Sequence, residues 1–275
     1  MDDQTQAELE AAVRAKPRDP VALRNLGCLL DGTGRHPEAI ILYRSVIGLS
    51  PGDPIAHNNL GLAYLHEGLT DAARVAFEAA VSLDPSYALA YLNLAEWQRL
   101  HGDPGEAEAC YRAYLRLRPT DVQVLYDLGV LQIVRGLRDQ AATCFRQVLR
   151  LQPEHPGARI NLGAILLRRG RAGAAVRMFA EVVSRDPGQS LARYHLALAL
   201  LAQRDLAAAA RELERVLERE PGSLRTASNL ARVYRELGRI EEARQCFQRV
   251  VELEAEGSAR QARARAALEE LGAGA

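Results

Sequence analysis

Seven prolines recur at intervals of 34 residues, and this spacing limits the fold more than any other feature of the sequence. They are Pro17, Pro51, Pro85, Pro119, Pro153, Pro187 and Pro221. With this proline numbered as position 32, seven units fill residues 20–53, 54–87, 88–121, 122–155, 156–189, 190–223 and 224–257 without an insertion. A fixed period of about 20–50 residues is typical of chains that stack copies of one small unit. The sequence therefore predicts a repeat architecture.

Each unit carries two apolar stripes with helical spacing. Positions 4, 7, 8 and 11 form the first stripe, and positions 20, 24, 27 and 28 form the second. Residues three or four apart share one face of a helix. Position 7 is always leucine, position 20 is always alanine, and position 8 is always glycine or alanine. We therefore predict two closely packed helices per unit, with the bulky residue at position 24 filling the space between hairpins.

Glycine and proline mark where the predicted helices end. Position 15 is glycine in six units and Arg204 in the other. Glycine readily adopts the left-handed conformation that ends a helix, whereas proline lacks the N–H that the next helical hydrogen bond needs. A helix that continued through Pro119 or Pro153 would contradict this pattern.

Both ends of the chain are expected to cap the array. Residues 1–19 place Leu9, Ala12 and Pro17 at positions 24, 27 and 32, as a lone second helix would. Residues 258–275 begin with Ser258 and carry Arg265 where the units have a small residue. We expect an N-terminal capping half-repeat and a C-terminal capping helix and tail, which complete a solenoid of sixteen helices.

Composition argues against several classes of partner. The chain has 35 Lys and Arg and 35 Asp and Glu, so its net charge gives no reason to expect nucleic acid or a membrane surface. The N-terminus does not resemble a secretory signal, and no stretch approaches the ~18 apolar residues that span a bilayer. Four cysteines without zinc-type spacing favour a reducing, cytoplasmic location.

The sequence contains no recognisable catalytic motif. It lacks a phosphate-binding loop, a GxSxG nucleophile turn and an HExxH zinc motif. The six histidines never pair at helical spacing. We therefore expect no enzyme activity, no metal, no cofactor and no small-molecule substrate.

This pattern resembles the tetratricopeptide repeat (TPR) family over residues 20–257. The resemblance implies an all-α fold, an α-solenoid that winds as a right-handed superhelix of seven helix-turn-helix repeats. It also implies that the first helices line the concave surface through positions 2, 5, 6, 9, 12 and 13. Position 4 departs from the family pattern because it is aromatic only at Tyr91.

Position 6 carries a ladder of side chains that can form hydrogen bonds: Asn25, Asn59, Asn93, Asp127, Asn161, His195 and Asn229. An asparagine amide both donates and accepts, so it can pair with an extended peptide backbone. The ladder is similar to that in the superhelical TPR domain of O-GlcNAc transferase, which grips peptide backbones. Alternatively, these amides bond to the neighbouring repeat. Peptide binding requires amides that point into the groove and are unpaired when it is empty.

Apolar residues at the other concave positions indicate an interaction surface, and the alternative is that adjacent helices partly cover several of them. They are Ile55, Leu62, Leu65, Leu89, Leu92, Tyr126, Val130, Ile133, Ile160, Leu167, Tyr194, Leu198 and Leu201. We expect a protein-binding adaptor that holds an extended or helical protein segment near the second to sixth units.

The carboxylate clamp of chaperone-binding TPR domains is not expected here. The corresponding positions of the first three units hold Arg24, Cys28, Asn59, Leu89 and Asn93, so two cations and one amide are missing. Two other functions remain open, namely a self-associating assembly scaffold and a regulatory arm for a separate catalytic chain.

Overall fold

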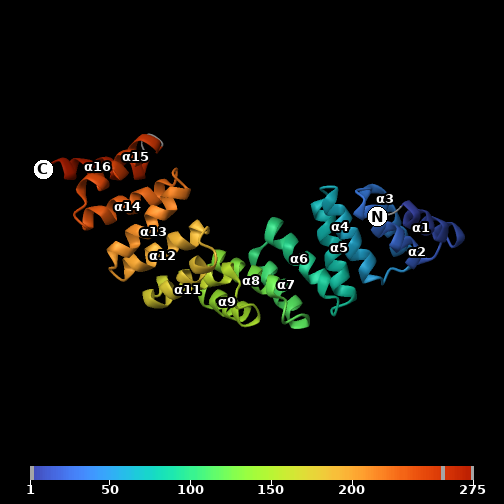
Figure 1. The fold of residues 1–275 in the computed structure, drawn as a ribbon. Coiled ribbons are helices and arrows are strands. Elements are labelled where there is room, and N and C mark those ends of the chain that lie inside the picture. Colours follow the sequence, from blue (N-terminus) through green and yellow to red (C-terminus); the bar gives the residue numbers. More distant parts are fainter. Residues whose placement is uncertain (1–2, 255–257, 274–275) are drawn as a thin grey trace. The chain divides into compact units, whose positions relative to one another are not determined.

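The computed structural model describes residues 3–254 and 258–273, which form sixteen α-helices and no β-strand (Figure 1). The predicted all-α solenoid of helix-turn-helix repeats is thereby confirmed. The helices are α1 (Asp3–Ala15), α2 (Pro20–Gly32), α3 (His36–Leu49), α4 (Pro54–His66), α5 (Thr70–Leu83), α6 (Ala88–His101), α7 (Pro104–Leu117), α8 (Val122–Val134), α9 (Arg138–Leu151), α10 (Pro156–Arg168), α11 (Ala172–Arg185), α12 (Ser190–Ala202), α13 (Leu206–Arg219), α14 (Leu224–Glu236), α15 (Ile240–Leu253) and α16 (Ala259–Ala273).

The chain forms two compact units, residues 1–137 with α1 to α8 and residues 138–275 with α9 to α16. We call them the N-terminal unit and the C-terminal unit. Within each unit every helix packs against the next helix in the chain. The first helices of neighbouring repeats are also in contact. For example, α2 contacts α4 and α10 contacts α12. The last three positions of the seventh period, residues 255–257, lie outside the described residues.

Helix boundaries fall at the same positions in six of the seven periods. All seven second helices run from position 17 to position 30, and six of the first helices run from position 1 to position 13. Aspartates before several helices accept hydrogen bonds from the first turn, as Asp53 does from Ile55 and Ala56 at 2.9 and 3.0 Å. The α7 and α9 helices end two residues before Pro119 and Pro153, as predicted.

Five of the six position-15 glycines adopt the expected left-handed conformation, with φ between 73° and 81°. The prediction was wrong for Gly102, which has φ −121°. Here α6 is one residue longer, and Gln98 Oε1 accepts a hydrogen bond from the Asp103 backbone N–H at 3.1 Å. A Cβ atom on Gly102 would overlap this Gln98 amide, so a larger residue there would have to displace the Gln98 side chain.

Arg204 takes the left-handed conformation without being a glycine, at φ 64°. This conformation brings Cβ close to the following carbonyl oxygen, at a cost of about 1–2 kcal/mol. We expect Arg204→Gly to raise the free energy of unfolding by about 0.5–1 kcal/mol, since glycine relieves the strain but is more flexible when unfolded. Urea unfolding monitored by circular dichroism measures the change. Gly170→Ala, at the equivalent turn, should be destabilising by a similar amount, and a neutral result for both would contradict the strain argument.

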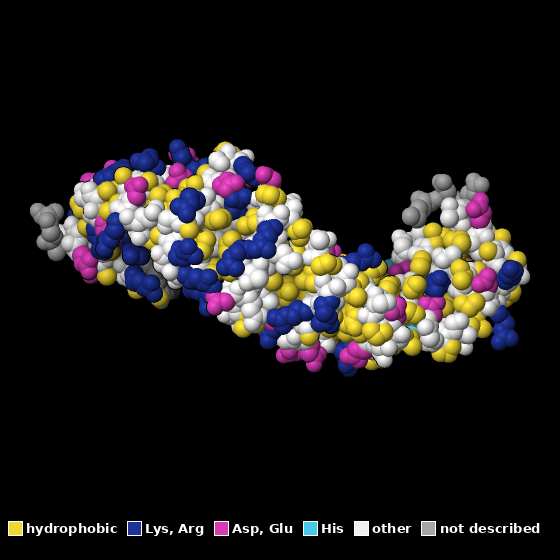
Figure 2. All heavy atoms as spheres, turned by 90° about the horizontal axis from the view of Figure 1, so that it is seen from below, with side chains coloured by type: hydrophobic (Ala, Val, Ile, Leu, Met, Phe, Trp, Pro, Cys, Tyr) yellow, Lys and Arg dark blue, Asp and Glu magenta, His cyan; other side chains and the backbone are white. Residues whose placement is uncertain are grey.

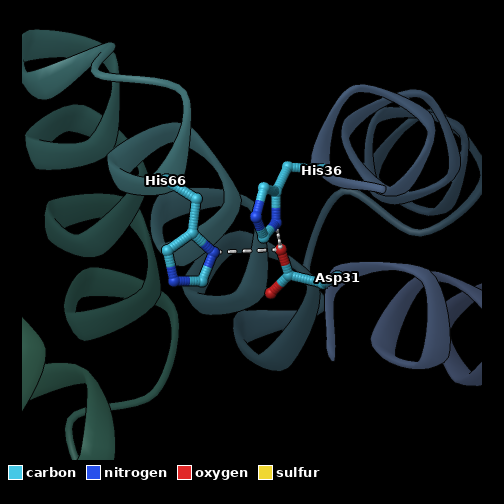
Figure 3. A group of neighbouring side chains, drawn as sticks. All are labelled: Asp31, His36 and His66. Atoms are coloured by element: carbon cyan, nitrogen blue, oxygen red, sulfur yellow. Dashed lines mark hydrogen bonds and ion pairs between the residues drawn. The ribbon is translucent and has the colours of Figure 1, made fainter. Parts of the chain in front are cut away.

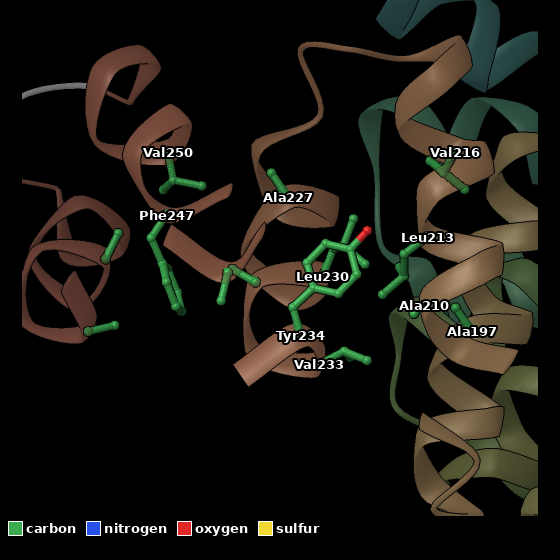
Figure 4. Packing of buried hydrophobic residues seen from close by; sticks show 14 of the residues in the cluster. Ala197, Ala210, Leu213, Val216, Ala227, Leu230, Val233, Tyr234, Phe247 and Val250 are labelled. Carbon is green, nitrogen blue, oxygen red and sulfur yellow. The ribbon is translucent and has the colours of Figure 1, made fainter. Parts of the chain in front are cut away.

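The core includes the side chains at positions 7, 20, 24 and 27 of every repeat, as the periodicity predicted. In the C-terminal unit, for example, Leu213, Val216, Leu230, Phe247 and Val250 are buried in one cluster (Figure 4). The aromatic ring at position 24 lies directly against the glycine at position 8 of its own repeat. A Cβ on Gly27, Gly61 or Gly163 would approach that ring to 2.8, 2.5 or 2.8 Å respectively. Close packing therefore explains why position 8 is small.

Two buried arginines replace the usual aromatic residue at position 4. Arg159 and Arg193 are 9% and 6% exposed. Arg193 pairs with Glu212 at 2.5 Å and donates to the Pro187 carbonyl oxygen at 2.9 Å. Arg159 similarly pairs with Glu181 and donates to a proline carbonyl. Each arginine therefore joins its repeat to the position-32 proline of the preceding repeat.

The α16 helix packs against α15 at the end of the array. Ser258 Oγ accepts from the Gln261 N–H at 3.1 Å and so caps its first turn. Gln261, Ala264 and Ala267 are buried, whereas Arg265 is exposed. The exposed side of α16 carries charged residues, Arg260, Arg263, Arg265, Glu269 and Glu270, among exposed alanines.

Candidate functional site

Three position-6 asparagines form hydrogen bonds back to the preceding repeat. Asn93 Nδ2 donates to Asn58 Oδ1 at 2.7 Å, and Asn229 Nδ2 donates to the Tyr194 hydroxyl at 2.8 Å. Asn59 Nδ2 lies 3.2 Å from Cys28 Sγ. The condition for peptide binding, an amide with no protein partner, is not met at these three positions. Their geometry favours a role in spacing consecutive first helices.

The other members of the ladder differ from one another. Asp127 accepts from Gln123 Nε2 at 3.0 Å, and burial raises its pKa despite that bond. The His195 ring stacks on Phe179 with centroids 5.4 Å apart, and burial, followed by the charge of Arg225, lowers its pKa. Asn25 is exposed and Asn161 is half-buried. The seven side chains therefore do not present one uniform row of amides.

Two of the apolar residues expected to line an open groove are instead in the core. Ile160 is 7% exposed and Tyr194 is 6% exposed, so neither offers a free surface to a ligand. This expectation was wrong for both residues, and for Tyr194 the reason is contact with α14, from which Arg225 lies over its ring and Asn229 donates to its hydroxyl. Of the others named as ligand contacts, Val130 is 37% exposed, and the following are half-buried: Leu62, Leu92, Tyr126 and Leu198.

A hollow of about 660 Å³ lies between α14 and α16 in the C-terminal unit. From α14 it is lined by residues at positions 2, 5, 6, 9 and 12, the positions assigned to the concave surface: Arg225, Ser228, Asn229, Arg232 and Arg235. From α16 it is lined by Arg260, Arg263, Ala266 and Glu270, among others. We call this hollow the arginine groove, after Arg225, Arg232, Arg235, Arg260 and Arg263.

The five arginines of the groove are not equally engaged with protein. Arg235 pairs with Glu270 at 3.0 Å, and Arg260 pairs with Glu254 at 2.5 Å. The Arg225 guanidinium lies 4.1 Å from the centre of the Tyr194 ring, which fixes its orientation. Among the described residues no carboxylate pairs with Arg232 or Arg263, and both are exposed. The groove therefore holds an excess of positive charge that is available to an anionic ligand.

A smaller hollow of about 240 Å³ adjoins the arginine groove and shares Asn229 and Arg232 with it. Its walls include Leu198, Leu201 and Leu206. The rest of its wall includes Val233 and the ion pair of Arg204 with Glu236 at 3.7 Å, so leucines and charged groups adjoin along α12 and α14. This combination suits a segment that carries acidic groups beside an apolar side chain.

The unit that contains the arginine groove also carries an excess of positive charge. Residues 138–275 contain 23 of the 35 cationic residues and 17 of the 35 acidic ones, so the C-terminal unit has a net charge of +6. Residues 1–137 have a net charge of −6. Figure 2 shows the dark-blue side chains gathered over the part of this face that belongs to the C-terminal unit. A net charge of zero for the whole chain therefore conceals two oppositely charged halves.

A hollow of about 780 Å³ lies at the ends of α6 and α7 in the N-terminal unit. Its charged residues are one arginine, Arg118, and one aspartate, Asp121, which accepts a hydrogen bond from the Tyr114 hydroxyl at 2.6 Å. Loop residues rather than concave positions form most of its wall. It has no preference for one sign of charge, so we regard the arginine groove as the stronger candidate.

Two clusters of side chains in the structure could not be found from the pattern within single helices. Arg260 and Arg263 lie in the capping helix, which was expected only to seal the array, although continuing the 34-residue period into α16 would have placed Arg263 at position 6. The second cluster consists of two histidines and an aspartate, which the search for histidines at helical spacing within one helix could not detect. Asp31, His36 and His66 come together in the N-terminal unit because helix ends from two repeats meet there.

The fold defines a class of protein, namely an α-solenoid of helix-turn-helix repeats. Two family profiles give the same class. The profile for the middle TPR-like domain of cilia and flagella-associated protein 70 matches residues 91–254, and a tetratricopeptide repeat profile matches residues 3–54, 50–88 and 58–122. The chain belongs to the tetratricopeptide repeat family. Proteins with this fold generally mediate protein–protein interactions and are typically non-catalytic.

Solved structures of TPR proteins share the fold. A structure of MamA from Desulfovibrio magneticus RS-1 is 26% identical, covers 62% of this chain and 97% of that one, and has a TM-score of 0.59. YrrB, described as a TPR protein with an unusual peptide-binding site, is 20% identical over 67% of this chain and 95% of that one, with a TM-score of 0.59. The C-terminal part of a TPR protein from Cytophaga hutchinsonii is 16% identical over 87% of this chain and 98% of that one, with a TM-score of 0.70.

No curated protein sequence matches this chain significantly. Within residues 3–254 and 258–273, no helix has the length and apolar character needed to cross a lipid bilayer.

Proposed function

We propose that this chain is a protein-binding module that holds an acidic segment of another protein in the arginine groove, with an adjacent apolar side chain of that segment in the leucine-lined hollow. The observation that carries the proposal is the composition of the groove, which combines five arginines with Glu270 as the one acidic residue in its wall. Arginine forms forked, charge-assisted hydrogen bonds with carboxylates, so it suits such a ligand.

The position of the groove supports the proposal. Its α14 residues occupy the positions that line the concave surface in TPR proteins, and its far wall comes from α16. The neighbouring hollow places Leu198 and Leu201 beside Arg232, so one ligand can reach both. YrrB, a structural relative with the same fold, is described as having a peptide-binding site. The sequence led us to expect binding near the second to sixth repeats. The proposed surface lies instead on the sixth and seventh repeats and α16.

Binding of a fluorescent peptide that alternates glutamate and leucine tests the proposal. We expect fluorescence anisotropy to show binding to the full chain, and much weaker binding of a matched peptide in which glutamine replaces glutamate. The double variant Arg232→Glu/Arg263→Glu should bind the acidic peptide at least about tenfold more weakly, because each lost charge-assisted hydrogen bond is worth about 1.5–3 kcal/mol. Neither arginine is buried, so the melting temperature should change little.

The double variant Arg177→Glu/Arg211→Glu is the matched control. It makes the same change in net charge with exposed arginines of α11 and α13 that do not line the groove. An equal loss of affinity in this control would show only general attraction between charges and would contradict a defined groove. Equal binding of the glutamine peptide, or displacement of the acidic peptide by single-stranded DNA at lower concentration, would also contradict the proposal.

The opposite charges of the two units favour one alternative, association of one copy with another. The N-terminal unit, at −6, could supply the acidic surface for the arginine groove of a second copy at +6. Light scattering distinguishes the two functions. A monomer whose mass is independent of salt supports binding of a different protein. A larger particle that dissociates in high salt, or in the Arg232→Glu/Arg263→Glu variant, supports a self-associating scaffold.

A further inference from the structure

Two histidines and an aspartate converge where the first and second repeats meet. Asp31 lies near the end of α2, His36 is the first residue of α3, and His66 is the last residue of α4. Asp31 Oδ1 is 2.7 Å from His36 Nδ1 and 3.2 Å from His66 Nδ1. Figure 3 shows both imidazole rings turned toward the same carboxylate oxygen. The three potential ligand atoms all lie within 4.8 Å of one another.

This donor set matches the requirements of a divalent transition metal. Imidazole nitrogen and carboxylate oxygen are ordinary ligands of zinc, with bonds of about 2.0–2.2 Å. Two such ligands in a tetrahedral arrangement are about 3.4 Å apart, compared with 2.7 and 3.2 Å between Asp31 Oδ1 and the two imidazole nitrogens, so binding an ion requires these side chains to separate slightly. An aspartate beside two histidines also supplies negative charge to balance the ion.

The cluster is open to solvent on the side of His66. The side chains of Asp31 and His36 are 15% and 22% exposed, so their positions are fixed by packing. The His66 side chain is 49% exposed and can rotate by the small amount needed to complete the site. Water can reach the open side of the cluster, so three protein ligands would be joined by one or more water molecules.

We propose that Asp31, His36 and His66 form a binding site for Zn²⁺ or a similar divalent transition-metal ion that links the first two repeats. The ion would join the turn between α2 and α3 to the end of α4, which are otherwise held together through helix packing. Because the complete set of ligands exists only when both repeats are folded and stacked, the ion stabilises the N-terminal unit. The proposal is independent of the arginine groove, which lies in the other unit.

Metal titration of the full, untagged chain after treatment with a chelator tests this site. We expect isothermal titration calorimetry to show one Zn²⁺ per chain and addition of Zn²⁺ to raise the melting temperature by several degrees. Co²⁺ should give visible absorption typical of mixed nitrogen and oxygen ligands, and Zn²⁺ should abolish it. The His66→Ala variant should bind Zn²⁺ at least about tenfold more weakly and should lose the Zn²⁺-dependent rise in melting temperature.

Two further variants separate a metal site from a simple hydrogen-bonded cluster. Asp31→Asn keeps an oxygen that can accept from both histidines but removes the charge, so metal-free stability should change little while metal affinity falls. His101→Ala removes an exposed histidine of α6 outside the cluster and should leave metal binding unchanged. The proposal is wrong if the unaltered chain gives neither Co²⁺ absorption nor a Zn²⁺-dependent melting shift. It is equally wrong if Asp31→Asn binds Zn²⁺ as tightly as the unaltered chain, or if His101→Ala lowers the affinity for Zn²⁺ as much as His66→Ala does.

Discussion

Replacing Phe179 with alanine is expected to lower the free energy of unfolding by about 3–5 kcal/mol, the usual cost of removing a large aromatic side chain from a core. Phe179 is fully buried at 0% exposure. Its ring lies against the Gly163 backbone and stacks on His195, so no flexible side chain at these contacts can fill the cavity. Urea unfolding monitored by circular dichroism measures the loss.

Hydrogen exchange measures which helices lose stability when Phe179 is replaced. Each repeat contacts only its neighbours, so amides of α10 to α12 should lose protection more than those of the N-terminal unit. Leu191→Ala is the control, because this α12 leucine is 51% exposed and should cost less than about 0.5 kcal/mol. A uniform loss of protection over the whole chain would show that the repeats unfold as one cooperative body, which would contradict the local argument.

Replacing Arg193 with alanine is expected to cost about 2–4 kcal/mol, because it leaves buried polar partners without their cation. The Arg193 and Glu212 side chains are 7% and 14% exposed. Arg193 also holds the Pro187 carbonyl at the junction with the preceding repeat. We place the cost below the largest values for buried ion pairs because Glu212 retains a second partner, Arg215, at 3.1 Å. Thermal and urea unfolding measure the change.

A double-mutant cycle distinguishes the ion pair from packing alone. Arg193→Leu should destabilise the protein, and Arg193→Leu/Glu212→Leu should recover much of the loss, since an apolar pair leaves no uncompensated charge. Exposed Arg211→Ala, in the adjacent helix, should have almost no effect. If Arg193→Ala lowers the free energy of unfolding no more than Arg211→Ala does, the buried pair contributes nothing measurable to stability and the junction depends on helix packing.

The arginines of this protein have different roles according to whether they are buried or exposed. Arg193 faces inward and is neutralised within the protein, whereas Arg232 and Arg263 face outward and pair with no carboxylate among the described residues. Burial therefore separates arginines that hold repeats together from those that can recruit a ligand. This distinction explains why a stability variant and a binding variant can be designed from the same residue type.

The sequence predicted the repeating architecture because its causes are local or periodic. A proline every 34 residues and glycine or Arg204 at position 15 determine where helices end through the backbone of the residue itself. Buried leucine, alanine and aromatic residues recur at helical spacing, so the core positions could be predicted without coordinates. The turn at Gly102 escaped prediction because the Gln98 side chain, rather than the backbone preference of glycine, decides its geometry.

The candidate sites were less predictable because they depend on side chains from different repeats. Residue identity alone could not decide whether the Asn93 amide turns toward a ligand or toward Asn58, and the structure pairs it with Asn58. The regular period located the concave positions on α14, but only the packing of α16 brings Arg263 opposite Arg232.

By itself, the sequence determined an α-solenoid of TPR hairpins, the boundaries of its helices and most of its core, because hydrogen bonding along a helix and burial of periodic apolar residues act within one repeat. The tertiary structure decided which polar side chains meet. Asp31 and His66 are separated by 35 residues and converge because consecutive repeats stack with one particular offset and rotation. That offset arises from the packing of many side chains at once, so no short stretch of sequence encodes it.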